Sequence, residues 1–210
     1  MPVRTPFLAL AALTAALCVG CASLKEQPEG AAGHSLQGNW TLDDNGHEAA
    51  IAQLDTLLDK QRQKLRRERR RGPAGSNDAP GFEGGPEDLS FTPQEQRERR
   101  DQLVQFLTPP QQLAIQQSDT DVLLKADNAS PRDLEPGHTL TRFDESGTAT
   151  IEAGWDGVSF VVRTRFTDGS SREERYTPDA KAGSLVVVRN LDENSLGKVQ
   201  LTSRYTRAAP

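Results

Sequence analysis

Cysteine, aromatic residues and long hydrophobic runs are all scarce in this chain. Only 2 of its 210 residues are cysteine, 5% are aromatic, and the mean hydropathy is -0.64. Two cysteines cannot form the disulfide framework of a small secreted scaffold, and a chain this polar cannot cross a membrane many times. Glycine, with 17 residues, is too rare for a collagen-like repeat. The composition therefore leaves one modest polar domain with an appendage.

The patterns that mark most catalytic and cofactor sites are absent as well. The three histidines, His34, His47 and His138, are far apart, and neither G-x-S-x-G nor a phosphate-binding glycine loop occurs. No spacing of His, Cys and Asp residues repeats as metal ligands do. We therefore expect no enzyme activity, no metal ion and no cofactor. A cryptic hydrolase, whose paired carboxylates follow no local motif, is kept as an alternative.

The longest apolar run lies at the front of the chain, where it extends from Phe7 to Val19. A run of that length is too short to span a bilayer as a permanent helix. It has the length of a signal-peptide core, and a single arginine, Arg4, precedes it. The protein is therefore expected to be exported.

The residues after this run resemble the bacterial lipobox, in which a small residue precedes a cysteine that becomes the lipidated first residue. Gly20 precedes Cys21 in this way, whereas a leucine precedes Cys18. We therefore predict a lipoprotein signal peptide over 1–20 and acyl chains such as palmitate on Cys21, which anchor the protein to a membrane. Ala22 stands where an Asp often retains such proteins at the inner membrane, which implies the outer membrane, facing the periplasm. The alternative is an ordinary secreted protein cleaved near the same place.

Changes in composition divide the rest of the chain. Residues 21–35 contain proline and glycine without an apolar period and are expected to form a flexible tether. Apolar and polar residues alternate over 36–43, which predicts a first strand. A helical insert follows over 44–108, and a glycine- and proline-rich linker at 72–86, expected to be disordered, interrupts it. The remaining residues, 109–207, are expected to form a β-meander domain.

The insert contains two helical patterns. Leucines recur at helical spacing within 47–71, which predicts the first helix. The second helix begins at Thr92, because Pro93 suits the first helical position and Glu95 completes a capping box. Two prolines stop this helix after Leu107.

The end of the first predicted helix is strongly basic although the chain has a net charge of -5. We call these residues the cationic run: Lys60, Arg62, Lys64, Arg66, Arg67, Arg69, Arg70 and Arg71. The helix dipole favours cations at this end but accounts for only part of the run. We expect the run to bind an anionic lipid, lipopolysaccharide or an acidic protein, and a merely solvated helix end is the alternative. Nucleic acid is not expected as a partner of an exported lipoprotein.

After Pro110 the sequence alternates between apolar and polar residues in short runs separated by turn signals such as Asp156-Gly157 and Asp168-Gly169. The runs lie at 113–115, 122–124, 139–143, 148–155, 158–166, 172–177, 185–191 and 199–206. Together with the first strand they predict a mainly β fold. It is an antiparallel up-and-down meander, curled into a barrel or sandwich, with a charged two-helix insert after the first strand.

The order of short motifs resembles that of a group of uncharacterised bacterial envelope proteins. These motifs include G-N-W-T-L-D at 38–43, L-A-I-x-Q-S-D-x-x-V at 113–122, G-W-D-G-x-x-F-V-V-R-T at 154–164 and R-Y-x-R at 204–207. The resemblance implies a lipocalin-like β-meander in the bacterial cell envelope. It implies no activity and no catalytic residues.

Two sets of residues are candidates for a ligand cavity. Trp40 and Trp155 are expected in the core, and the alternative is that they line a cavity together with Phe160. Three arginines alternate with the apolar face of the sheet and are expected to face solvent: Arg163, Arg165 and Arg172. If the meander closes with these arginines inward, the cavity is cationic and suits an acidic ligand.

These observations predict a non-enzymatic envelope module with a binding or structural role. Its expected target is an anionic envelope component or a lipophilic ligand. A periplasmic stress chaperone or accessory factor, acting through the helical arm, is the first alternative, because the residues from Thr92 loosely resemble the L-T-x-x-Q motif of such chaperones. The cryptic hydrolase is the second.

Overall fold

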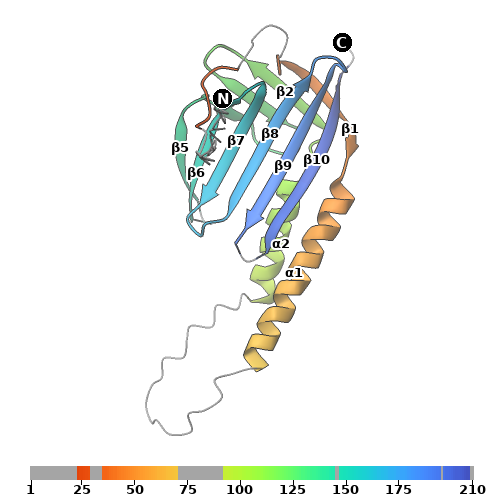
Figure 1. Ribbon diagram of the computed structural model, residues 1–210, viewed down its shortest axis with the longest axis vertical. Coiled ribbons are helices and arrows are strands. Elements are labelled where there is room, and N and C mark those ends of the chain that lie inside the picture. Colours follow the sequence, from red (N-terminus) through yellow and green to blue (C-terminus); the bar gives the residue numbers. More distant parts are fainter. Residues whose placement is uncertain (1–22, 29–34, 71–91, 145–146, 195, 209–210) are drawn as a thin grey trace, which may run out of the picture.

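The computed structural model describes residues 23–28, 35–70, 92–144, 147–194 and 196–208. They form two helices, α1 (His47–Arg70) and α2 (Pro93–Leu107) (Figure 1). The strands are β1 (Gly38–Asn45), β2 (Gln112–Gln117), β3 (Val122–Ala126), β4 (Arg132–Leu134), β5 (Thr139–Asp144), β6 (Gly147–Asp156), β7 (Ser159–Phe166), β8 (Ser171–Asp179), β9 (Ser184–Glu193) and β10 (Gly197–Arg207). The predicted signal peptide, Cys21, Arg71 and the predicted linker at 72–86 lie outside the described residues.

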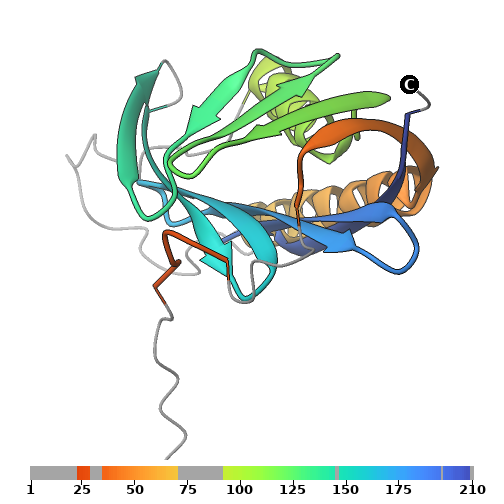
Figure 2. The same cartoon turned by 90° about the horizontal axis from the view of Figure 1, so that it is seen from above.

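All these strands belong to one antiparallel sheet in the order β4-β3-β2-β1-β10-β9-β8-β7-β6-β5. The first strand pairs with the last, so β1 lies between β2 and β10, and the two edges of the sheet are β4 and β5. The sheet curls into a barrel that is open between these edges (Figure 2). The predicted fold class, a lipocalin-like antiparallel meander with two helices inserted after the first strand, is confirmed.

Alternation along the strands places one set of side chains inside the barrel. In β10, buried and exposed residues alternate from Val199 to Tyr205, as expected for a sheet with one buried face. The inward residues of the other strands join Tyr205 in the main core, where the rings of Trp155 and Phe160 lie 5.3 Å apart. This core fills the end of the barrel that carries the β6–β7 turn.

The two helices cover the opposite end. Leucines of α1 and α2 pack against inward residues of β9 and β10 in a second cluster, which comprises Leu54, Leu58, Leu103, Leu107, Leu191, Leu196, Val199 and Leu201 with the small Ala50. Arg100 of α2 donates two hydrogen bonds to Asp55 of α1, at 2.8 and 3.0 Å, and so joins the helices. The predicted capping box is present at Thr92, whose Oγ1 accepts from the backbone N–H of Glu95 at 3.2 Å. Among the described residues, neither helix is long and apolar enough to cross a membrane.

Two elements differ from the sequence prediction. The strand β4 was not predicted, because Arg132–Leu134 offers only three residues and a single apolar side chain. The first strand covers Gly38–Asn45 rather than 36–43, and a bulge lies between Leu42 and Asp44. The bulge shifts the pairing with β10, which the apolar alternation at the start of the strand does not indicate.

The N-terminal described segment, 23–28, lies against the barrel. The backbone N–H of Lys25 donates to the carbonyl of Trp155, and that of Trp155 donates to the carbonyl of Lys25, both at 2.8 Å. Leu24 is buried, and a Cβ added to Gly154 would lie only 2.7 Å from Leu24 Cβ, so glycine permits this close approach. Part of the stretch expected to be a flexible tether is therefore paired with β6.

Candidate functional site

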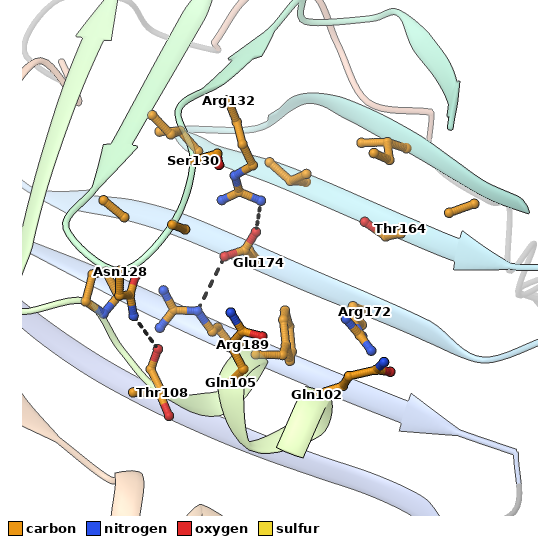
Figure 3. A pocket seen from close by; sticks show the side chains of 18 of the residues that line it. Gln102, Gln105, Thr108, Asn128, Ser130, Arg132, Thr164, Arg172, Glu174 and Arg189 are labelled. Carbon is orange, nitrogen blue, oxygen red and sulfur yellow. Dashed lines mark hydrogen bonds and ion pairs between the residues drawn. The ribbon is translucent and has the colours of Figure 1, made fainter. Parts of the chain in front are cut away.

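A cavity of about 390 Å³ lies inside the barrel, next to α2. Apolar residues from several strands form part of its wall: Leu113, Leu124, Ile151 and Val162. Gln102 and Gln105 of α2 face it from the helical side (Figure 3). The cavity lies between the main core and the helices, and its size is within the range of small-molecule sites.

The charged residues of the wall are mostly basic. Among the described residues, four arginines and one glutamate line the cavity: Arg132, Arg142, Arg172, Arg189 and Glu174. No group of three or more His, Cys, Asp or Glu side chains suited to a metal ion occurs in the part of the chain that the structure describes. The wall therefore combines apolar surface with an excess of fixed positive charge.

Glu174 is the centre of a buried hydrogen-bond network. Arg132, from β4, donates through Nη1 to Glu174 Oε2 and through Nη2 to the hydroxyl of Tyr176, the latter at 2.9 Å. The Tyr176 hydroxyl donates to Glu174 Oε1 at 3.1 Å, and Arg189 Nε approaches the same oxygen at 3.4 Å (Figure 3). A short edge strand and two central strands are thus connected through one carboxylate.

The network keeps its ionisable groups in fixed protonation states. Burial alone would raise the pKa of Glu174, but the charges of Arg132 and Arg189 outweigh it and lower the pKa to about 2. Burial alone would lower the pKa of each arginine, but the charge of Glu174 raises both. Burial and the same carboxylate raise the pKa of Tyr176. At neutral pH the network therefore holds two guanidinium ions, one carboxylate and a neutral phenol.

Arg189 is the least satisfied member of this network. The residue is only 5% exposed, and its Nη1 atom is buried without a hydrogen-bond partner among the described residues. A buried donor without an acceptor costs free energy, and the cost is larger when the donor is charged. Arg189 therefore contributes positive charge to this wall that the described part of the network only partly compensates.

Arg172 connects the cavity with the helical end of the barrel. Its guanidinium carbon lies 5.3 Å from the ring centre of Phe106 in α2 and 4.9 Å from that of Phe166 in β7. Both distances suit cation–π contacts. α2 is further held to β9 by Arg99, whose Nη2 donates to the buried Glu193 at 2.5 Å. These contacts fix α2 as the helical wall of the cavity.

The structure separates the arginines that the sequence analysis treated as one set. Arg163 and Arg165 pair across the outer face with acidic residues, Arg163 Nε with Glu173 at 2.9 Å and Arg165 Nη1 with Glu152 at 3.4 Å. Arg172, which we also expected to face solvent, lines the cavity. It lies opposite the buried Leu191 of β9, so it shares the inward face.

The aromatic candidates lie in the core. Trp40, Trp155 and Phe160 are all at most 3% exposed and none belongs to the described lining of the cavity. Trp40 Nε1 donates to the carbonyl of Leu36 at 3.0 Å, which satisfies its only polar group. Their placement agrees with the core interpretation rather than with the cavity alternative.

The described part of the cationic run is exposed. α1 continues beyond the sheet, and this end of the helix carries the run (Figure 1). The five members with described side chains are all exposed: Lys60, Arg62, Lys64, Arg66 and Arg67. Arg62 Nη1 lies 3.3 Å from Asp59. The side chains of Arg69 and Arg70, and Arg71 as a whole, lie outside the described part of the chain.

Sequence reasoning assigned no member of the network to a site, and two of its three charged residues carried a signal. Arg189 is two residues from both Val187 and Leu191 in a predicted strand, so all three lie on the same face and a charged residue occupies an inward position. Glu174 is likewise two residues from Tyr176 in the alternating pattern of β8. Arg132 carried no such signal, because its strand was not predicted.

Comparison with solved structures finds distant similarity. No family model matches the chain, and no curated protein matches it significantly. A secretary abundant heat soluble protein from Ramazzottius varieornatus is 10% identical, with a TM-score of 0.45 over 88% of this chain and 99% of that one. Zebrafish ileal bile acid-binding protein, solved with cholic acid, is 10% identical, with a TM-score of 0.42 over 82% of this chain and 98% of that one. Likeness at this level does not indicate what the present chain binds.

Proposed function

We propose that this protein is a binding module that holds a small amphiphilic anion in its barrel cavity. The observation that carries the proposal is the mainly basic wall of the cavity, where the described lining includes four arginines and one glutamate, and where Arg189 is one of the arginines. A carboxylate, phosphate or sulfate head would balance this positive charge, because such groups form strong charge-assisted hydrogen bonds with guanidinium ions. The apolar wall that includes Leu124 and Ile151 would accept the rest of the molecule.

An equilibrium titration tests this function. We would titrate the mature chain, residues 21–210, with a dansyl-labelled undecanoate and follow its fluorescence. Arg189→Met should weaken binding about 10- to 100-fold, since a hydrogen bond to a charged group contributes about 1.5–3 kcal/mol. Arg163→Met is the matched control, because Arg163 lies on the outer face and should leave affinity unchanged. Equal affinity of both variants and the parent would refute the proposal.

A second binding surface is the cationic run. Its described side chains all lie in solvent, on a helix end that extends past the sheet, and this exposure supports docking to an anionic lipid, lipopolysaccharide or an acidic protein. Together with the lipidation proposed for Cys21, the run would place the protein at a membrane of the bacterial cell envelope, facing the periplasm. The chaperone alternative would use the same helical arm without the cavity, so loss of ligand binding in Arg189→Met would leave chaperone activity intact.

A further inference from the structure

The barrel has a lateral gap, because its two edge strands are consecutive in the chain yet are not paired with each other. A hollow lies in this gap between β4 and β5, where the apolar part of its lining consists of Leu134, Leu140, Ile151 and Ala153, with acidic and polar residues at the rim. Ile151 lines this hollow and also the cavity inside the barrel. The gap and the cavity are therefore in contact through one shared side chain.

Leu140 marks the gap as an apolar opening. It lies directly opposite Ile151 in the β5–β6 pair, so both side chains are on the inward face of the sheet. Ile151 packs against the main core, whereas Leu140 is 59% exposed. Arg142 follows Leu140 by two residues in β5, so it lies on the same face, and it lines the cavity. Leu140 is exposed because no strand pairs with the open side of β5, and it gives the gap an apolar surface beside the hollow.

The N-terminal segment brings the gap close to the predicted lipid anchor. β5 pairs with β6 only as far as Glu152, and Lys25 pairs with Trp155 in the part of β6 that β5 leaves free. Gly137, in the connection between β4 and β5, lies against Glu26. Leu24 is the first buried residue of the described part of the chain, and only two residues separate it from Cys21. Consecutive Cα atoms are about 3.8 Å apart, so the Cα atoms of Cys21 and Leu24 are at most about 11 Å apart. A lipid on Cys21 would hold this side of the barrel at the bilayer.

We propose that the gap between β4 and β5 is the entrance to the cavity and faces the anchoring bilayer, so that the ligand is a single-chain anionic amphiphile taken up from that bilayer. The inference rests on the proposed binding function and on lipidation of Cys21. The exposed leucine provides an apolar path for the chain of the amphiphile. The arginines beyond it provide the site for the head group.

A chemical block of the gap tests the entrance. In the mature chain with Cys21→Ser, Leu140→Cys would be coupled to a bulky maleimide, and binding of dansyl undecanoate would be followed by stopped flow. Association and dissociation should both slow by the same factor, at least about tenfold, because an obstruction raises one barrier in both directions. The dissociation constant should stay unchanged.

Phe143→Cys with the same adduct is the matched control. Phe143 is 77% exposed and alternates with Arg142, so it lies on the outer face of the same edge strand, and its adduct should leave both rates unchanged. Unaltered rates with the Leu140 adduct would overturn the entrance. A loss of affinity at an unchanged association rate would overturn it too, since Leu140 would then belong to the binding site. If the unmodified chain binds no probe at equilibrium, the proposed function fails and the entrance with it.

Coupling to vesicles tests the bilayer as the source. The mature chain would be attached through Cys21 to maleimide lipid in phosphatidylcholine vesicles loaded with dansyl undecanoate. Transfer of dansyl undecanoate from the vesicle to the attached protein should be faster than its transfer to the same amount of unattached Cys21→Ser protein. The rate of transfer to the attached protein should not depend on vesicle dilution. Gly154→Ala should displace Leu24 and so slow transfer to the attached protein without changing the affinity in solution. Gly46→Ala is the matched control: its Cβ would meet only ordinary contacts, beginning at 3.7 Å, and it should leave the transfer rate unchanged. Transfer that falls with dilution in the attached protein would contradict uptake from the bilayer.

Discussion

Glu174 and Arg189 face each other across neighbouring strands inside the barrel, in directly paired positions of β8 and β9. Arg189 Nε lies 3.4 Å from Glu174 Oε1, and Arg132 approaches the other carboxylate oxygen from the edge strand β4. One carboxylate thus compensates two guanidinium ions. The remaining positive charge faces a cavity, which links the stability of the barrel interior to its binding chemistry.

Acid should weaken this interior. The pKa of Glu174 is lowered from 4.5 to about 2, so its contribution to stability is fully present above pH 4.5 and is lost as the pH falls toward 2. A shift of this size corresponds to about 3 kcal/mol. Urea unfolding at a series of pH values should therefore show a fall in the free energy of unfolding over this window.

Glu174→Gln should remove that part of the pH dependence. It should also lower the free energy of unfolding at neutral pH by about 3–5 kcal/mol, because both arginines would lose their buried counter-charge. Glu173→Gln is the control, since Glu173 is paired with Arg163 on the outer face and should cost far less. The same acid slope in Glu174→Gln and the parent would contradict the assigned role of this carboxylate.

Much of the fold follows from local patterns in the sequence. The alternation over 158–166 and 185–191 predicts the strands that the structure has at Ser159–Phe166 and Ser184–Glu193, because one face of the sheet is buried. The capping box at Thr92 predicts the start of α2 because it satisfies free backbone N–H groups. These signals are local, so one sequence is enough to see them.

The features that shape the site depend on contacts between distant residues. The bridge between Lys25 and Trp155 uses backbone atoms, which any residues provide, and only Gly154 hints at the close approach. β4 is held by pairing with β3 and by the contact of Arg132 with Glu174, not by its own composition. Arg189 was visible as a charge at an inward position, but its partner could be identified only once the register of β8 and β9 was known.

The pairing of the N-terminal segment should be measurable by hydrogen exchange. Lys25 and Trp155 each donate a backbone hydrogen bond to the other, so both amides should exchange slowly in the mature chain. Leu24→Asp places a charge at a buried position and should speed exchange at Lys25 while the amides of β9 keep their protection. Fast exchange at Lys25 in the parent would show that the segment is the flexible tether predicted from its composition.

Lipidation should depend on Cys21 and not on Cys18. Cys21→Ser should yield an unprocessed or soluble product when the full chain is expressed in a bacterium that modifies lipoproteins. Cys18→Ser should still incorporate labelled palmitate, because Cys18 lies within the predicted leader. Label retained in Cys21→Ser but lost in Cys18→Ser would reverse the assignment.

Binding of the cationic run to an anionic surface should be strongly salt-dependent. Near such a surface each basic residue contributes about 1 kcal/mol, and screening shortens the range of this attraction from about 10 Å at 0.1 M salt to about 3 Å at 1 M. The soluble mature chain with Cys21→Ser should therefore sediment with vesicles rich in anionic lipid, or with lipopolysaccharide, at low salt only. Replacing Arg66, Arg67, Arg69, Arg70 and Arg71 with Gln should abolish this binding.

The control for this experiment changes arginines elsewhere on the surface. Arg163 and Arg165 lie on the outer face of the barrel and are paired with acidic residues, so replacing both with Gln should leave vesicle binding largely intact. We call the chain with the five arginines of the cationic run replaced by Gln the helix variant. If only the helix variant loses vesicle binding, the membrane-binding surface lies at the end of α1, because the control variant loses positive charge elsewhere. Equal sedimentation of the helix variant and the parent at every salt concentration would mean that the run is a solvated helix end and does not bind the membrane.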